Sequence, residues 1–255
     1  KSTRNDVLEI INTSKELGTY ADGTDQKKAL LLFESQLDST ARDKAGIEPI
    51  KPLLKAINDI QSIEDVQTVY TTTLGVSAPF AGIGANPDLN DSSMNIAWVF
   101  PGGLGLQRDR YLDQDENAKD IRNKYVDHIA RMFQFIDYDE ASARKAAELV
   151  LELETKLAEP RLDKVQSRDI RNFNNPKTIA ELSEMTPAIN WEKFITDMGV
   201  TKKLDTVLVM QPKYMTALND FLTNTPIEDI KTLMTWSTLD QAASYLSTEI
   251  ETANW

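Results

Sequence analysis

Residues 102–112 read Gly-Gly-Leu-Gly-Leu-Gln-Arg-Asp-Arg-Tyr-Leu, and residues 165–178 read Val-Gln-Ser-Arg-Asp-Ile-Arg-Asn-Phe-Asn-Asn-Pro-Lys-Thr. The first stretch closes a segment, residues 77–105, that holds five of the ten glycines and three of the ten prolines. This segment also contains the β-prone run 95–100, preceded by the turn-forming residues 90–93. We therefore expect a small β-hairpin insertion near residues 77–105.

The rest of the chain shows the apolar spacing of helices, so the expected fold class is mainly α. We expect one continuous helical domain over residues 1–255, without an internal linker or repeat. Expected helices cover about 7–17, 25–40, 121–136 and 143–158, and others begin near Pro49, Ser62, Thr178, Thr186 and Thr225. A short strand is expected at 206–210.

The last helix is expected to run from Thr225-Pro226 to about Trp255, because no glycine or proline interrupts it. It carries large apolar side chains without a stop signal. We therefore expect an exposed apolar patch near residues 245–255, where the helix leans on something absent from this chain, and either self-association through that patch or fraying of the last turns.

Composition excludes several classes of protein. The net charge is −12, which disfavours nucleic acid and anionic membrane surfaces as partners. The chain has no cysteine, which excludes disulfides and thiol chemistry. It has no apolar run long enough to span a membrane and opens without the apolar core of a signal segment.

Candidate chemical groups are few. The glycines at 102–105 lack the neighbours of a phosphate-binding loop, so we expect them to serve turns or close chain approach. The lone histidine, His128, is expected to pack or lie at the surface. Glu148, Glu152 and Glu154 share a helix with Lys145 and Lys156 and are expected on a solvated face. The sequence assigns no catalytic residue and no metal ligand.

One basic concentration stands out in this acidic chain, at Arg161, Lys164, Arg168, Arg171 and Lys177. Asp163 and Asp169 interrupt it, which favours an ion-paired loop that orders an irregular segment. Lining a site for an acidic or carboxylate-bearing ligand is the alternative.

Several motifs together resemble the amino-terminal half of neprilysin-like (endothelin-converting-enzyme-like) zinc endopeptidases. They are the two opening stretches and Ala45-Gly46-Ile47-Glu48-Pro49, Asn95-Ile96-Ala97-Trp98, Glu181-Leu182, Trp191, Gln211-Pro212-x-Tyr214, Thr225-Pro226 and Trp236. The chain departs from the family pattern at Pro101, where glutamine is usual, and at Gln107, where proline is usual. The tail, residues 251–255, looks most like that of bacterial members.

The resemblance implies that this chain is most of a helical, non-catalytic gating lobe. In the family a second lobe carries the zinc motif H-E-x-x-H, and zinc activates water for peptide cleavage. One histidine and no cysteine cannot supply that motif, so zinc is expected in the full-length parent and not in this fragment. Arg4 lies near the family's carboxylate-reading arginine, but displaced along its helix, and is not given that role.

The resemblance also implies peptide substrates, the carboxyl-terminal catalytic lobe of the same protein as partner, and a periplasmic or cell-surface location. The fragment alone is expected to be inactive. A different hypothesis stays open, that of a stand-alone helical scaffold or peptide-binding protein without enzymatic activity. Trp98, Phe100 and the turn at 102–106 are expected to pack against the helical body, because an isolated hairpin is marginally stable in water.

Overall fold

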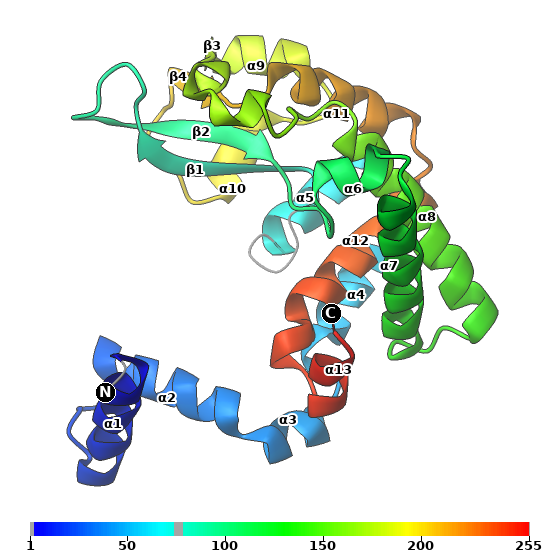
Figure 1. The fold of residues 1–255 in the computed structure, drawn as a ribbon. Coiled ribbons are helices and arrows are strands. Elements are labelled where there is room, and N and C mark those ends of the chain that lie inside the picture. Colours follow the sequence, from blue (N-terminus) through cyan, green and yellow to red (C-terminus); the bar gives the residue numbers. More distant parts are fainter. Residues whose placement is uncertain (1–2, 74–78, 255) are drawn as a thin grey trace.

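Two long antiparallel helices pack side by side along one edge of the molecule as seen in Figure 1. A computed structural model describes residues 3–73 and 79–254, in which α7 spans Glu116–Gln134 and α8 spans Glu140–Ala158. Asp115 and Asp139 cap these helices by accepting hydrogen bonds from the backbone N–H groups of Ala118 and Ser142, both at 2.8 Å. The expected helices at 121–136 and 143–158 are thereby confirmed.

Helices that follow later in the chain complete the core. They are α9 (Ile179–Met185), α10 (Trp191–Asp197), α11 (Pro212–Asn224), α12 (Ile227–Ala242) and α13 (Thr248–Ala253). α12 packs on α8, α7 and the early helix α4 (Lys51–Asn58), and α11 packs on α8 and α9. Trp236, Tyr214, Phe133 and Trp191 are almost fully buried where these helices meet.

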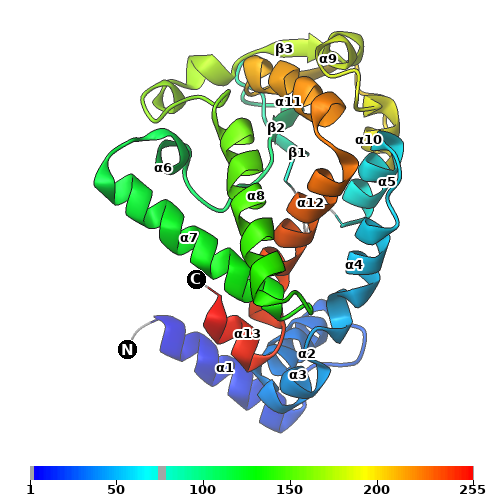
Figure 2. The ribbon, with the colours of Figure 1, turned by 90° about the vertical axis from the view of Figure 1, so that its right-hand side faces the viewer.

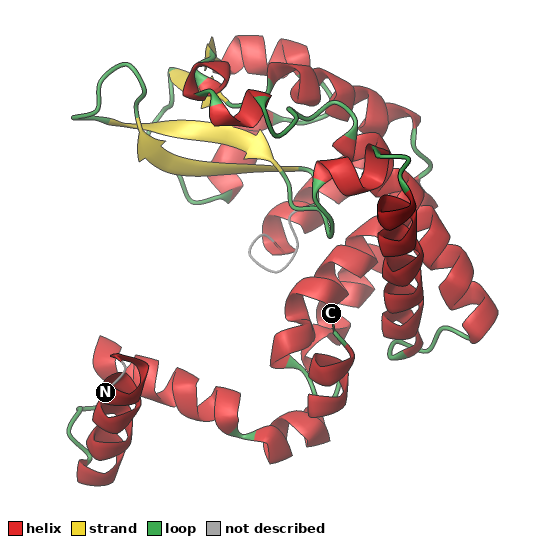
Figure 3. Cartoon of the chain, in the orientation of Figure 1, coloured by secondary structure: helices red, strands yellow, loops and turns green. Residues whose placement is uncertain are grey.

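A four-stranded sheet lies at one end of this helical body (Figure 3). Its order is β1 (Ala81–Pro87), β2 (Asn95–Pro101), β4 (Thr206–Val209) and β3 (Pro176–Thr178). β1 and β2 form the expected antiparallel hairpin, β2 and β4 run parallel, and β3 is antiparallel to β4. The structure therefore confirms the mainly α fold class, with a β insertion; residues 77 and 78 of the expected insertion lie outside the described ranges.

The strand β2 is buried on both faces. Val99 belongs to the main hydrophobic cluster, whereas Trp98 pairs in register with Leu208 and both are buried outside that cluster. The indole N–H of Trp98 donates to the carbonyl of Pro87 at 3.2 Å. Leu104 and Leu106 are half-buried and pack against the main cluster, so the turn at 102–106 packs on the helical body as expected, whereas Trp98 is buried outside that cluster and Phe100 is half-buried.

The first two helices project from this body, whereas the third packs on α13. α1 (Thr3–Leu17) and α2 (Asp25–Leu37) form a helical hairpin, and α3 (Ser39–Ala45) joins it to the rest of the chain (Figure 1). The prediction of one helix over 25–40 was wrong, because Asp38 caps a new helix by accepting a hydrogen bond from Ala41 N at 3.0 Å. Short 3-10 helices follow at Glu48–Ile50, Gln166–Arg168, Ile170–Phe173 and Ala243–Tyr245.

The end of the chain differs most from expectation. Instead of one helix to Trp255, which lies outside the described residues, α12 ends at Ala242, and α13 begins after Ser247. The Ser247 hydroxyl accepts a hydrogen bond from Ile250 N, which starts a new helix and turns the chain. Leu246 and Ile250 are only 2% exposed, so the apolar patch expected near 245–255 is absent from the described part of that region, where only Tyr245 is an exposed large hydrophobic.

Two helix starts are also corrected. Thr186 ends α9 with its buried hydroxyl donating to the Met215 carbonyl at 2.9 Å, and α10 begins later, after Asn190. The cap of α12 is Pro226 and not Thr225. In contrast, the capping box Thr178–Glu181 and the Ser62 cap of α5 (Ile63–Thr73) are present as expected. Among the helices of the described ranges, none combines the length and apolar character needed to cross a bilayer.

Candidate functional site

A buried carboxylate lies beneath the glycine-rich stretch at residues 102–112. Glu154 is 3% exposed and belongs to α8. Its Oε2 accepts hydrogen bonds from the hydroxyls of Tyr111 at 2.7 Å and Tyr125 at 2.8 Å, and its Oε1 accepts one from Gly105 N at 3.3 Å. These groups, which we call the Glu154 cluster, bring together the 102–112 stretch, α7 and α8.

The cluster extends in two directions. The hydroxyl of Tyr111, in the short helix α6 (Arg108–Leu112), accepts a hydrogen bond from Leu106 N at 2.8 Å. The hydroxyl of Tyr125 accepts one from the indole N–H of Trp236 at 3.1 Å. The glycine-rich turn is therefore held on α6, α7, α8 and α12 by hydrogen bonds between polar groups with low exposure. Breaking any of these hydrogen bonds would leave a buried polar group unpaired, which costs stability.

Gly105 is needed for close approach. A Cβ at this position would lie 1.8 Å from the Tyr125 hydroxyl oxygen, whereas a Cβ at Gly103 would meet nothing within 4 Å. Gly102, Gly103 and Gly105 are not among the glycines with positive φ. Of the two reasons expected for this glycine run, close chain approach is therefore the one that applies at Gly105.

Burial shifts the titration of these groups. Desolvation raises the pKa of Glu154 to about 7, although the hydrogen bonds from Tyr111 and Tyr125 oppose this shift. Burial and the neighbouring Glu154 charge raise the pKa values of both tyrosines, which therefore remain neutral donors. Burial also raises the pKa of Asp240, whose charge adds to the rise at Glu154.

The assignment of Glu154 to a solvated face was wrong. Glu148 and Glu152 pair on the surface with Arg144 and Lys156, at 3.0 and 2.7 Å. Glu154 instead follows the buried Val150 by four residues and precedes the buried Leu157 by three, so it lies on the apolar stripe of α8. This helical spacing from Val150 and Leu157 is the sequence feature that identifies Glu154 as a buried residue.

His128 is buried in α7, close to this cluster. Its ring lies 5.5 Å from the Trp236 ring, edge to face, and Arg131 Nη2 lies 3.2 Å from its Nδ1. Burial, followed by the Arg131 charge, lowers the pKa of His128 to about 4. The expectation of a packed histidine is confirmed, and Arg131 also donates to the Ala253 carbonyl at 2.9 Å, which ties the end of α13 to α7.

The two opening stretches meet at a surface pocket of about 480 Å³. Its lining includes Leu106 and Arg108 from the first stretch, Ser167 and Arg168 from the second, and Arg161 between them. Figure 2 shows α6 and the segment after α8 on the same side of the molecule. The two stretches lie more than 50 residues apart in the sequence, and the fold places them together.

The basic concentration divides into two groups. Arg171 pairs with Asp169 at 2.7 Å and Lys177 with Glu181 at 3.6 Å, as expected for an ion-paired loop. Arg161 is held differently, with its Nε donating to the Leu157 carbonyl at 3.1 Å and its guanidinium 5.0 Å from the centre of the Tyr214 ring. Arg161, Lys164 and Arg168 all line the pocket.

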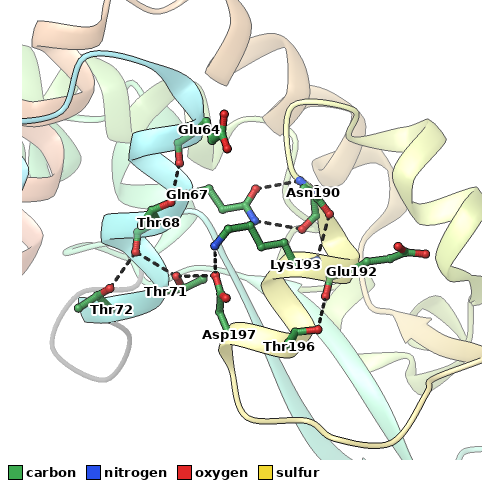
Figure 4. Close-up of polar contacts among 10 residues, drawn as sticks. All are labelled: Glu64, Gln67, Thr68, Thr71, Thr72, Asn190, Glu192, Lys193, Thr196 and Asp197. Atoms are coloured by element: carbon green, nitrogen blue, oxygen red, sulfur yellow. Dashed lines mark hydrogen bonds and ion pairs between the residues drawn. The ribbon is translucent and has the colours of Figure 1, made fainter.

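A second polar interface joins α5 to α10 (Figure 4). Gln67 and Asn190 exchange two hydrogen bonds, from Gln67 Nε2 to the Asn190 carbonyl at 3.0 Å and from Asn190 N to Gln67 Oε1 at 2.8 Å. Lys193 pairs with Asp197 at 2.5 Å beside Thr71. The apolar cavity behind this interface holds about 20 Å³, space for roughly one water, so this cavity is too small for a larger ligand.

Comparisons with known proteins agree over the whole chain. The sequence model of the amino-terminal part of peptidase family M13 matches residues 1–255. The chain belongs to peptidase family M13. Endothelin-converting enzyme 1 of Rattus norvegicus is 24% identical over 258 residues, which are 96% of this chain and 34% of the relative. Neprilysin-3 of Drosophila melanogaster is 24% identical over 214 residues, 77% of this chain and 27% of the relative.

Solved structures show the same fold over nearly the whole chain. The zinc metalloprotease Zmp1 of Mycobacterium tuberculosis, in complex with an inhibitor, superposes with a TM-score of 0.90 at 25% identity over 98% of this chain and 38% of that one. PepO from Lactobacillus rhamnosis has a TM-score of 0.79 at 16% identity, covering 97% of this chain and 40% of that chain, and shows the fold alone. These two bacterial proteins support the bacterial type, and the chain spans about a third of the length of its curated relatives.

Candidate metal ligands lie scattered in the described part of this M13 chain. Within residues 3–73 and 79–254, no three His, Cys, Asp or Glu side chains gather as metal ligands. The lone imidazole is buried between Trp236 and Arg131, whose charge disfavours a cation there. Arg4, in the first turn of α1, is exposed, and we assign it no role.

Proposed function

We propose that this chain is the helical, substrate-gating part of a zinc endopeptidase that cleaves short peptides. The observation that carries the proposal is the agreement of family model and fold over the whole chain, with a TM-score of 0.90 to a zinc metalloprotease of which this chain corresponds to 38%. The remaining part of the parent protein would hold the zinc and the catalytic base, because these 255 residues contain no H-E-x-x-H.

The shape of the chain supports the gating role. The sheet and the helical hairpin α1–α2 lie at opposite ends of a curve, with α12 and α4 between them (Figure 1). A curved lobe of this kind, closed against a second lobe, would enclose a cavity that admits peptides and excludes folded proteins. The Glu154 cluster and the α5–α10 interface would serve to keep that curve rigid.

The proposal includes the partners and the location. The partner is the catalytic carboxyl-terminal part of the same protein, and the substrates are peptides. Zinc in the parent would polarise the peptide carbonyl and activate water, as it does in other zinc hydrolases. We place the parent outside the cytoplasm, at the cell surface or in the periplasm.

Gating is tested in the full-length parent with one cleavable sequence presented in two ways. The sequence is supplied as a free short peptide and as a loop of a stable folded domain, and products are followed by mass spectrometry. We expect the free peptide to be cleaved at least about a hundredfold faster, since the folded domain cannot enter the cavity. Equal rates would contradict gating, and activity that survives zinc chelation would contradict the zinc mechanism.

Experiments on the 255-residue chain distinguish the hypothesis of a peptidase fragment from that of a stand-alone scaffold or peptide-binding protein. After dialysis against excess zinc, metal analysis should find no stoichiometric zinc, because carboxylates without imidazole or thiol ligands suit harder cations. The same sample should leave a short unstructured peptide intact. A tight one-to-one zinc site, or metal-dependent cleavage, would place the active site within these residues. A peptide bound tightly without cleavage would favour the scaffold hypothesis.

A further inference from the structure

The pocket between the two opening stretches is basic in an otherwise acidic chain. Four cationic side chains line it, Arg108, Arg161, Lys164 and Arg168, against the single carboxylate of Asp109. The chain as a whole carries a net charge of −12. Such a local reversal of sign in a concave site attracts anions, because a recess focuses the field of the charges that line it.

Two of these cations are uncommitted. Across the described ranges, Lys164 and Arg168 form no ion pair, in contrast to Arg171, three residues further along, which is bound to Asp169 through both of its carboxylate oxygens. The Arg108–Asp109 contact is long at 3.6 Å. The positive charge of the pocket is therefore not neutralised by its own lining.

The other two cations carry buried donors without acceptors. Arg108 Nε and Arg161 Nη2 are shielded from solvent and have no hydrogen-bond partner within the described part of the chain. Because solvent does not reach these two atoms, an anion in the open pocket can be bound only by the other N–H groups of the two side chains. Beside them Gln211 binds Leu162 N through Oε1 at 2.9 Å, which leaves its amide N–H groups available as donors.

We propose that this basic pocket binds an oxyanion, a carboxylate or a phosphate group, between Arg108 and Arg161, with Lys164 and Arg168 at the rim. The planar guanidinium groups offer paired N–H donors that match the oxygens of such groups, and the two flexible rim cations add attraction. The site is independent of zinc and of gating. Its ligand is either a free inorganic anion or a carboxylate on an acidic peptide, and both are recognised by the same donors.

The test uses two probes on the 255-residue chain: inorganic phosphate, and a short glutamate-rich peptide with both ends blocked. Binding is followed by ¹⁵N-resolved NMR, with the side-chain amide of Gln211 and the backbone N–H of Leu106 and Ser167 as reporters. We expect saturable shifts at these positions with at least one probe, and weaker binding as salt is raised through about 0.5 M, because screening shortens the reach of exposed charges. Shifts with phosphate alone identify a free anion, and stronger shifts with the peptide identify an acidic segment.

Paired variants locate the site. Arg168→Gln removes a rim charge, and Arg171→Gln removes the same charge just outside the pocket, so both change the net charge equally. We expect Arg168→Gln to weaken binding by more than Arg171→Gln, whose effect should stay below about twofold, and Lys164→Gln added to Arg168→Gln to bring the loss to about tenfold. All three positions are at the surface, so the fold should be unaffected. Equal weakening by Arg171→Gln, or the absence of saturable shifts with either probe, would overturn the proposal.

Discussion

The helical hairpin α1–α2 and the bundle of α7, α8 and α12 have a similar apolar pattern in their sequences but differ in how much of it is buried. Both show apolar residues at helical spacing. In α7 and α8 eight residues each are buried, among them Phe133 and Leu153, whereas α1 buries only Ser14 and α2 only Leu30. The apolar face of the hairpin stays exposed, at Val7, Leu8, Ile10, Leu17, Leu31, Leu32 and Leu37.

An amphipathic pattern therefore identifies the apolar face of a helix, but it does not show whether another part of the same chain packs on that face. The bundle finds its partners within the chain and adds a polar anchor, the Glu154 cluster. The hairpin has an internal ion pair, Lys15 with Glu34 at 3.0 Å, and reaches the rest of the chain through contacts such as that of Gln36 Nε2 with the Ser244 carbonyl at 3.5 Å. Stability should therefore be concentrated in the bundle.

The largest effect is expected from deleting a bundle side chain. Trp236 is 1% exposed, packs on Phe133 and Tyr125, and donates its indole N–H to the Tyr125 hydroxyl. Trp236→Ala should lower the free energy of unfolding by about 4 kcal/mol, since it leaves both a cavity and an unpaired polar group. Chemical denaturation measured by circular dichroism gives this value.

The hairpin provides the matched comparison. Leu32 in α2 is 67% exposed, so Leu32→Ala should change the unfolding free energy by less than about 0.5 kcal/mol. Comparable losses for Trp236→Ala and Leu32→Ala would mean that the hairpin is as firmly packed as the bundle, and the comparison would fail.

A second effect tests the anchor itself. Gly105→Ala would place a methyl group 1.8 Å from the Tyr125 hydroxyl oxygen and force that tyrosine away from Glu154. We expect a loss of about 2–3 kcal/mol from this strain and from the broken hydrogen bonds. Gly103→Ala is the control, because its Cβ meets nothing within 4 Å and should cost under about 1 kcal/mol. A harmless Gly105→Ala would show that the turn can move without affecting the bundle.

The fold class could be predicted from sequence, and the site only in part. The hairpin 81–101, the strand at 206–209 and the capping box at Thr178 follow from local chemistry, which a single sequence displays. The break after Ala242 was missed because Ser247 starts a new helix without any glycine or proline before it. Its position is stabilised by distant contacts, such as Thr248 N donating to Asp43 Oδ1 at 2.6 Å.

The Glu154 cluster was missed for a related reason. Charge pairing on a helix surface is a local pattern, and it describes Glu148 and Glu152 correctly. The acceptor role of Glu154 depends on donors 29 to 49 residues away, which only the fold brings within reach. The pocket between the two stretches likewise depends on the path of α8 between them.

A third prediction concerns pH and compares two buried groups of the bundle. The native chain keeps a proton on Glu154 that the unfolded chain releases, since the pKa is raised from 4.5 to about 7, so this group loses stability as pH rises through that window. The pKa of His128 is lowered from 6.5 to about 4, so this group gains stability as pH rises from about 4 to 6.5. The two slopes, each at most about 1.4 kcal/mol per pH unit, should largely cancel between pH 4.5 and 6.5.

Single variants should expose each slope. In Glu154→Gln the stability should rise from pH 4.5 to 6.5, and in His128→Gln it should fall over the same range, as measured by urea unfolding at each pH. The difference between the two variants in slope is the quantity to compare, because loss of packing shifts both curves without tilting them. Parallel curves for the two variants would show that neither group titrates differently in the folded chain.

The smallest effect on stability is expected in the hairpin, where the consequence should be association instead. Leu17 is 74% exposed and Leu32 is 67% exposed, in adjacent helices, whereas Tyr245 is 64% exposed near the end of α12. Exposed apolar surface of this kind favours contact between copies of the chain. Leu17→Ser with Leu32→Ser should reduce self-association in sedimentation experiments while changing the unfolding free energy by about 1 kcal/mol or less. Tyr245→Ser is the control and should leave association unchanged. If Tyr245→Ser reduced association and the double variant did not, the associating surface would lie near the end of the chain, as the sequence pattern predicted.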